Sequence, residues 1–237
     1  MVRKFVEISY LIGKTETVMP SNIPPPVLRA RSRMVQCPDG VGETETRWAS
    51  YNNTSIIEMC THSGTHIDAP FHIDPKGLTV DAFEIEELIF ENPLFVNIPK
   101  SDMEKITKDD LALYEDKLKR SDLLLIYTRF SVHRKNDPKR YIEKQPGLSE
   151  DAAKYLAGNF HLRAVGVDLL GIENIGEAKP NFPAHKALLK SGRRFLIMED
   201  ANLAPLLGKK IIRVYIIPLR FKDAEAMSVR AFAEVEE

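Results

Sequence analysis

The sequence predicts an α/β protein with a mixed sheet, an additional β-rich layer and flanking helices. In the second half of the chain, short apolar runs rich in β-branched residues alternate with segments of helical pattern, which is typical of a sheet covered by helices. The first half contains mostly strand-like segments, which indicates the additional β-rich layer. A chain of 237 residues, 43% of them hydrophobic, can bury a large core, and we expect residues 1–237 to form a single domain.

In the first half, a strand is predicted at residues 4–12. The prolines of residues 20–26 then indicate a loop, because proline lacks an amide donor and fixes φ. A connection this long is usually functional or mobile, and we expect it to form part of a pocket wall. Residues 27–36 alternate apolar and polar side chains, which predicts a half-buried strand. Further strands are predicted at residues 53–60 and 94–98.

In the second half, helix-start signals alternate with apolar runs. Thr107 and Ser149 each precede a segment of helical pattern, and both side chains are suitable helix N-caps. Residues 122–128 form a continuous apolar run, which is typical of a strand buried on both faces. Residues 129–144 are rich in Lys, Arg and polar residues, which predicts a solvated surface loop. A short helix is expected at residues 184–192, with strands at residues 163–170, 195–200, 210–219 and 228–235.

Charge and composition exclude several classes of protein. The chain has 33 Lys plus Arg and 34 Asp plus Glu, a net charge of −1, so it lacks the positive charge that binding to a phosphate backbone requires. Charged residues interrupt every apolar run before ~18 residues, so we expect no membrane span. The basic N-terminus has only a short apolar run broken by Glu7, which argues against a secretory signal. Cys37 and Cys60 cannot form a disulfide framework, which favours a reducing cytoplasm. The Gly-x-Gly at Gly40 lacks the strand-turn-helix context of a dinucleotide site.

The histidines are concentrated in one segment. Three of the six lie between His62 and His72, in the sequence HSGTHIDAPFH. His62, His66, Asp68 and His72 all occupy even positions, and residues of one parity share a face of an extended chain. Gly and Pro within the segment disfavour a helix. We therefore expect an extended or loosely turned segment that carries four chemically active side chains on one side.

Two His and one Asp on one face predict a metal site. His62, His66 and Asp68 would supply three ligands and leave room for water, as in a catalytic rather than a closed structural site. Cys60 is either a soft ligand or a small buried hydrophobe. The competing interpretation is that these histidines are hydrogen-bonded residues of a turn.

The same segment resembles the His-x-Gly-Thr-His-x-Asp-x-Pro-x-His signature of the metal-dependent cyclase-like hydrolase family, which includes bacterial kynurenine formamidases and isatin hydrolases. The resemblance extends to EISYLIG near the start, to PGLSEDAAKYL followed by AVGVD, and to AHKALLKSG followed by MEDANLAPL. It implies a swivelling β/β/α fold and a homodimer or homotetramer.

The resemblance also implies a set of site residues. His62, His66 and Asp68 would bind metal, with His185 and Glu199 as distal ligands to one or two divalent ions. Nitrogen and oxygen ligands without thiolate suit zinc, manganese or iron, and we expect zinc, with manganese as the alternative. His72 would act in acid–base catalysis. Without the resemblance, His185 would be interpreted as a surface helix residue and Glu199 as a strand-end carboxylate.

The expected function is hydrolysis of an amide, formamide or cyclic amide or ester bond of a small molecule by metal-activated water. A lyase or dehydratase using the same metal is an alternative, and so is a non-catalytic metal-dependent binding protein. The aromatic-Pro-Gly-Asp run that formamidases carry in the first loop is replaced here by residues 18–22, VMPSN, so the substrate stays open. Thr128, Arg129 and Asp168 lie at the ends of predicted strands and are expected to contact substrate or to be structural.

Overall fold

The computed structural model describes residues 3–36, 49–174, 181–190 and 193–236. Within these residues, nine strands form one mixed sheet. They are β1 (Arg3–Glu7), β4 (His66–Asp68), β5 (Ile89–Phe90), β6 (Pro93–Asn97), β8 (Leu123–Tyr127), β10 (Ala164–Val167), β11 (Leu196–Glu199), β12 (Lys210–Pro218) and β13 (Ala226–Glu236). The order is β5-β12-β13-β4-β11-β10-β8-β6, and β1 pairs with β13.

The sheet has a parallel half and an antiparallel half. Strands β6, β8, β10 and β11 are parallel, whereas β12, β13, β1 and β5 pair antiparallel. The short strand β4 lies between the halves and pairs antiparallel with both β11 and β13. A side chain on β4 therefore lies at the junction of the two halves.

Helices cover the parallel half. They are α1 (Lys108–Ala112), α2 (Glu115–Leu118), α3 (His133–Asn136), α4 (Pro138–Glu143), α5 (Glu150–Asn159) and α7 (Pro183–Leu189). The expected caps are confirmed, because Thr107 and Ser149 accept hydrogen bonds from the backbone N–H three residues on, at the starts of α1 and α5. No helix in the described ranges is long and apolar enough to cross a lipid bilayer.

Alternate residues of the parallel strands enter two different cores. Leu124 and Val165 pack with the helices, whereas Leu125 and Met198 pack with side chains from the antiparallel half. This alternation follows from the two-residue period of a strand. The predicted α/β class, with its mixed sheet, β-rich layer and helical layer, is therefore confirmed.

Shorter elements complete the body. A two-stranded parallel sheet joins β7 (Lys105–Ile106) and β9 (Gly147–Leu148). Single 3₁₀ turns are η1 (Pro70–His72), η2 (Val80–Ala82), η3 (Ile85–Leu88), η4 (Phe130–Val132) and η5 (Ala204–Leu206).

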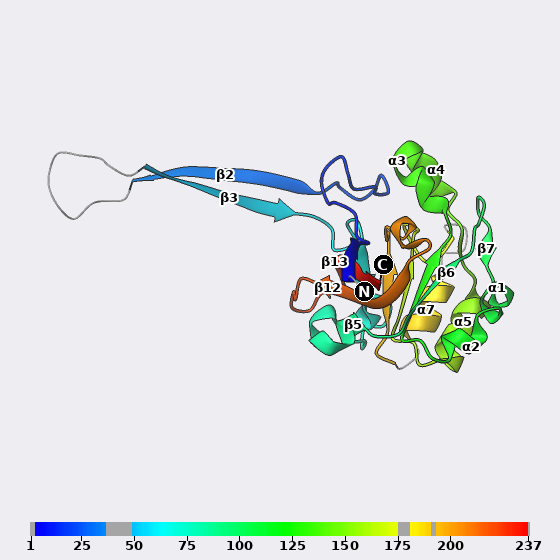
Figure 1. The fold of residues 1–237 in the computed structure, drawn as a ribbon. Coiled ribbons are helices and arrows are strands. Elements are labelled where there is room, and N and C mark those ends of the chain that lie inside the picture. The colour runs from blue at the N-terminus through cyan, green and yellow to red at the C-terminus, as the bar shows by residue number, and fades with distance from the viewer. Residues whose placement is uncertain (1–2, 37–48, 175–180, 191–192, 237) are drawn as a thin grey trace, which may run out of the picture.

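Strands β2 (Val27–Gln36) and β3 (Ala49–Glu58) form a separate two-stranded arm that projects far from the body (Figure 1). The prediction that residues 27–36 are half-buried is wrong at the root of this arm. Leu28 is 70% exposed and Ile57 65%, because the ribbon carries no covering layer there. Cys37 and Gly40 lie outside the described residues.

The prediction of a loop at residues 129–144 is also wrong, although most of the segment is exposed as expected. The segment consists of η4, α3 and α4, with Phe130, Arg134 and Tyr141 buried. The basic composition was misleading because Arg134 is neutralised by a buried partner, Asp200, that lies 66 residues further along the chain.

Candidate metal centre

A turn at Gly64 gathers the histidine segment. Gly64 has φ +65°, and a Cβ there would lie 3.2 Å from Ile12, so the position favours glycine. The turn brings the rings of His62 and His66 to 4.8 Å between centroids. The predicted extended face holds only within β4, for His66 and Asp68. His62 and His72 reach the site through the turn and through η1 instead.

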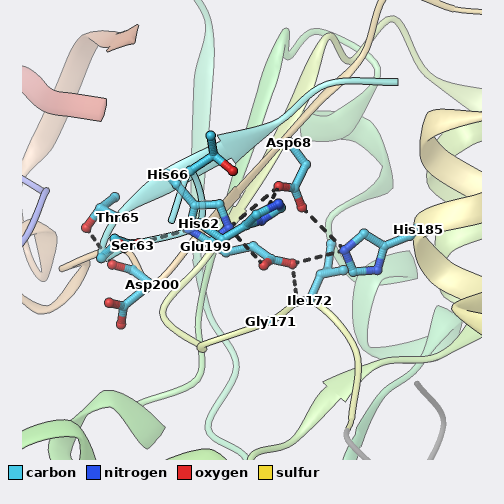
Figure 2. Close-up of polar contacts among 12 residues, drawn as sticks. His62, Ser63, Thr65, His66, Asp68, Gly171, Ile172, His185, Glu199 and Asp200 are labelled. Atoms are coloured by element: carbon cyan, nitrogen blue, oxygen red, sulfur yellow. Dashed lines mark hydrogen bonds and ion pairs between the residues drawn. The ribbon is translucent and has the colours of Figure 1, made fainter. Parts of the chain in front are cut away.

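Strand pairing and a helix bring in the distal residues. In the antiparallel pair of β4 and β11, Glu199 lies directly opposite His66, and opposite residues share a face. His185 comes from the first turn of α7, in front of this strand end. The structure thus brings together the six residues singled out from the sequence, which are His62, His66, Asp68, His72, His185 and Glu199. Figure 2 labels five of them, all but His72.

The nitrogen-to-oxygen distances at this site suit a shared cation. Nε2 of His66 lies 3.5 Å from Asp68 Oδ1 and 3.4 Å from Glu199 Oε2. Nε2 of His185 lies 3.4 Å from Asp68 Oδ2 and 3.3 Å from Glu199 Oε1, and Nδ1 of His62 lies 3.1 Å from Asp68 Oδ1. Ligand atoms that are about 2.0–2.2 Å from one ion at tetrahedral corners are roughly 3.3–3.6 Å apart.

Three buried polar atoms at the site make no hydrogen bond within the described structure. They are Nε2 of His66 and both carboxylate oxygens of Asp68. Buried polar atoms are nearly always paired, so unpaired ones need an explanation. A divalent cation accounts for all three, because imidazole nitrogen and carboxylate oxygen are its ligands.

In two histidines, the ring nitrogen that points away from the cluster makes a hydrogen bond, and this determines which nitrogen faces the site. Nδ1 of His66 lies 2.9 Å from the carbonyl oxygen of Gly64, and a carbonyl can only accept, so Nδ1 donates and Nε2 keeps its lone pair. Nδ1 of His185 is 2.9 Å from the buried Glu173 carboxylate, which orients that ring in the same way. This is the usual support of a metal-binding histidine.

Sequence reasoning missed two carboxylates around the site. Glu173 also accepts from the backbone N–H groups of Ala184 and His185, so it fixes the start of α7. Oε1 of Glu225 lies 3.5 Å from Nε2 of His62 and accepts from Thr61 Oγ1. Neither belongs to a motif, and only their position beside a histidine in three dimensions reveals them.

The charges of the site favour a cation. Burial lowers the pKa of His66, but the nearby carboxylate of Glu199 and the charge of Asp68 outweigh it and raise the pKa to about 9. Burial and Asp68 raise the pKa of Glu199, but His185 and His66 outweigh them and lower it to about 2. Two ionised carboxylates therefore require positive charge, from protons on histidine or from a metal ion that displaces them.

His72 differs from the other histidines. It is half-buried, with its ring 4.7 Å from that of His62 and 5.6 Å from that of His185. Burial is the largest influence on its pKa and lowers it, although Asp68 acts in the opposite direction. An uncharged imidazole beside the cluster can accept a proton.

A cavity of about 450 Å³ opens onto the cluster. The first loop, residues 13–23 in the connection between β1 and β2, supplies Met19, Pro20 and Ile23 to its wall. This agrees with the role expected of this long connection. Ile142, Leu170 and Phe182 also line the cavity. The cavity therefore combines apolar walls with one polar, metal-suited end, which is typical of a small-molecule site.

A family model described as "Putative cyclase" matches residues 6–174. The chain belongs to this cyclase family. Kynurenine formamidase of Geobacillus thermodenitrificans (strain NG80-2) is 34% identical over 190 residues, which cover 78% of this chain and 84% of that protein. A solved structure described as a predicted metal-dependent hydrolase from Bacillus stearothermophilus has a TM-score of 0.69 and 25% identity, with 99% of each chain covered. An isatin hydrolase bound to the product analogue thioisatinate has the same fold, with a TM-score of 0.76 at 19% identity over 99% of this chain and 93% of that one.

The resemblance drawn from HSGTHIDAPFH is thus confirmed at the level of the family, whose relatives include metal-dependent hydrolases. Two groups of closely spaced ligand atoms occur in the described part of this cyclase-family chain, one made of His62, Asp68 and His72 and the other of His66, Asp68 and Glu199. Cys60 belongs to neither group, and Asp68 belongs to both.

The other residues singled out after strands are structural. The buried Asp168 accepts from the N–H and the hydroxyl of Thr128, both at 2.7 Å, and from the hydroxyl of Ser131 at 2.9 Å. Arg129 donates to Asn97 at 3.0 Å. None of these side chains is among those that line the cavity at the metal-suited cluster.

Proposed function

We propose that this protein is a metal-dependent hydrolase that cleaves the C–N or C–O bond of a small amide, formamide or cyclic amide or ester. One observation carries the proposal. Unpaired buried ligand atoms of His66 and Asp68 converge with His185 and Glu199 at the polar end of a mostly apolar cavity. The chemistry that a divalent ion supplies in such a place is activation of water near neutral pH and polarisation of a carbonyl.

His72 would move the proton. Its lowered pKa leaves it uncharged at neutral pH, so it can take a proton from the attacking water and return one to the leaving nitrogen. His62, His66, Asp68, His185 and Glu199 would hold the metal. His62 lies on the side of the cluster next to His72, so a metal ion held by His62 would have the base nearby.

We propose zinc as the metal, with manganese as the alternative. The candidate ligands are nitrogen and oxygen atoms without thiolate, which suits both ions, and cellular availability then decides. Asp68 lies beside His62 and also beside His66 and Glu199, which supports a pair of ions as well as a single one. A carboxylate has two oxygens, so Asp68 can serve both positions.

The apolar walls support a substrate with a flat or aliphatic apolar part next to the scissile bond. Phe182 and Leu170 line the cavity together with residues of the first loop. Kynurenine formamidase among the relatives supports arylformamides as the first substrates to examine. Residues 18–22 of the first loop provide Met19 and Pro20 here, and no aromatic side chain.

The experiment is a hydrolysis assay with small formanilides, cyclic imides and lactones, with and without chelator, alongside metal analysis. We expect turnover that chelator abolishes and divalent metal restores, and a His62→Ala variant with reduced metal content. Products formed in oxygen-18 water carry the label if the reaction is hydrolysis, whereas a lyase or dehydratase incorporates none. Tight metal binding without turnover on any substrate would favour a binding protein instead.

We also propose that the protein is a homodimer or homotetramer in which a second copy covers the arm. A two-stranded ribbon alone is marginally stable in water, and the root of this one exposes Leu28, Ile56 and Ile57. Sedimentation measurements test this point. We expect Ile57→Asp to shift the protein towards the monomer, and a monomeric unmodified protein would contradict the proposal.

A further inference from the structure

The first loop borders two cavities. Met19, Pro20 and Ile23 line the cavity at the metal-suited cluster. Thr15, Glu16 and Val18 line a second cavity of about 580 Å³. Val18 also packs against the helical core, but within the described residues the loop makes few hydrogen bonds to the body, so each hydrogen-bonded contact matters for the shape of the substrate cavity.

Arg134 provides such a contact. Its Nη1 donates to the carbonyl oxygen of Glu16 at 3.0 Å. The other hydrogen bonds of the described loop segment are internal, such as those between Thr17 and Gly13 and from Ile23 N to Pro20 O. Arg134 thus joins the loop to the body at its midpoint.

The other guanidinium nitrogens of Arg134 are hydrogen-bonded too. Nε and Nη2 donate to the two carboxylate oxygens of Asp200, both at 2.7 Å. The guanidinium carbon lies 3.8 Å from the centre of the Tyr10 ring. Arg134 is only 7% exposed, so these contacts are shielded from water. A lysine could not reproduce this fork of two parallel hydrogen bonds to one carboxylate, because its ammonium is a single point of charge.

Asp200 is itself tied to the metal-suited cluster. It directly follows Glu199 and has φ +49°. Its carbonyl oxygen accepts from Thr65 Oγ1 at 2.6 Å, and its carboxylate accepts from Tyr141 Oη at 2.8 Å. The strand end that carries Glu199 therefore also fixes the position of Arg134. Through its hydrogen bond to Glu16, Arg134 in turn fixes the first loop relative to that strand end.

We propose that Arg134 is a positioning residue that aligns the first loop, residues 13–23, with the strand end bearing Glu199 and so sets the width of the substrate cavity. It acts on substrate fit through Met19, Pro20 and Ile23 and does not touch substrate itself, because it is absent from the lining of that cavity. The expected effect of Arg134 on KM rests on the proposed function, whereas its expected effect on the order of the first loop does not.

The test uses the full-length, metal-loaded protein and three variants. Arg134→Lys keeps a positive charge beside Asp200 but loses the fork. Arg134→Met combined with Asp200→Asn removes the pair together, so no unpaired charge is left buried. Arg140→Lys is the matched control, because Arg140 lies in the same helical region but pairs with Asp102 on the surface.

Hydrogen exchange of the peptide covering residues 11–26 is the first measurement. In both Arg134 variants we expect exchange in this peptide to be roughly ten-fold faster or more, with unchanged exchange in β8 and β10 and unchanged metal content. Arg140→Lys should match the unmodified protein. Unchanged exchange in the loop overturns the proposal. Failure of both Arg134 variants to fold also overturns it, since it assigns Arg134 to global stability.

Steady-state kinetics is the second measurement, on any substrate that the unmodified protein hydrolyses. We expect Arg134→Lys to raise KM with little change in kcat, and Met19→Ala to raise KM less in the Arg134→Lys background than alone. A fall in kcat with loss of metal would assign Arg134 to Glu199 instead and contradict loop positioning. If no substrate is hydrolysed, the proposed function fails, while the exchange measurement still decides the role of Arg134.

Discussion

Glu173 accepts a hydrogen bond from Nδ1 of His185 at 2.9 Å, which leaves Nε2 of His185 facing Asp68 and Glu199. Glu173 is 3% exposed and also accepts from the backbone at the start of α7. It therefore fixes both the ring and the helix that carries it. Removal of such a partner from a metal-binding histidine typically reduces metal affinity about 10–100-fold.

We accordingly expect Glu173→Ala to reduce metal affinity by roughly 10–100-fold, as measured by competition with a chelator of known affinity. Glu225→Gln is the control, because its contact with His62 is 3.5 Å and its side chain is 37% exposed. We expect its effect to be several-fold smaller. Equal affinities in the Glu173→Ala and unmodified proteins would show that His185 needs no orienting partner.

A second prediction concerns His72. His72→Ala should retain its full metal content and lose about 10²–10⁴-fold in kcat, the usual contribution of a positioned acid–base group. Metal analysis and steady-state kinetics on the same preparation check both parts. Turnover equal to that of the unmodified protein would remove His72 from the proton transfer, and loss of metal would make it a ligand.

A third prediction concerns the pH dependence of stability in the chelator-treated protein. The pKa of His66 rises from 6.5 to about 9, so its stabilising contribution is complete below pH 6.5 and is lost as the pH rises towards 9. The pKa of Glu199 falls from 4.5 to about 2, so its contribution is complete above pH 4.5 and is lost as the pH falls towards 2.

The free energy of unfolding of the metal-free protein should therefore be highest between pH 4.5 and 6.5 and should decline on both sides. Urea titrations at about pH 5.5 and about pH 9 measure it. The Glu199→Gln, His66→Gln double variant, which lacks both groups, is the control and should show a flatter profile. A metal-free protein that is more stable at the higher pH would refute this charge arrangement.

A fourth prediction concerns Gly64. Its φ is +65°, and a Cβ at this position would lie 3.2 Å from Ile12, so Gly64→Ala should lower the free energy of unfolding by about 1–2 kcal/mol. Gly158→Ala is the matched control, because Gly158 lies in α5 with open space where a Cβ would stand. It should be neutral or stabilising. Denaturant unfolding compares the two, and a smaller loss at Gly64 than at Gly158 would be inconsistent with the turn.

Much of the fold was predictable because its strands have clear local sequence patterns. Residues 122–128 and 195–200 are apolar runs bounded by polar residues, and they form β8 and β11. The histidine segment was equally legible, because four chemically active side chains lie within eleven residues. The proposed reason for their convergence was only partly right, since a Gly64 turn, and not a continuous strand, positions His62.

The features that the sequence did not disclose depend on distant partners. Arg134 is buried because Asp200 lies 66 residues away in the chain and beside it in space. Glu173 is important because α7 folds back over it, a relation that no local pattern encodes. The exposure of Leu28 was missed for the related reason that alternation predicts a strand but not whether anything covers it.

Asp68 tests the central claim most directly, because it contributes to both groups of candidate ligand atoms. The measurement is the divalent metal content per chain of the unmodified protein and of Asp68→Asn, each purified without chelator and confirmed to be folded. We predict one or two ions per chain in the unmodified protein and almost none in the variant. An unmodified protein without metal, or an Asp68→Asn variant that keeps the full amount, would contradict the assignment of a metal centre.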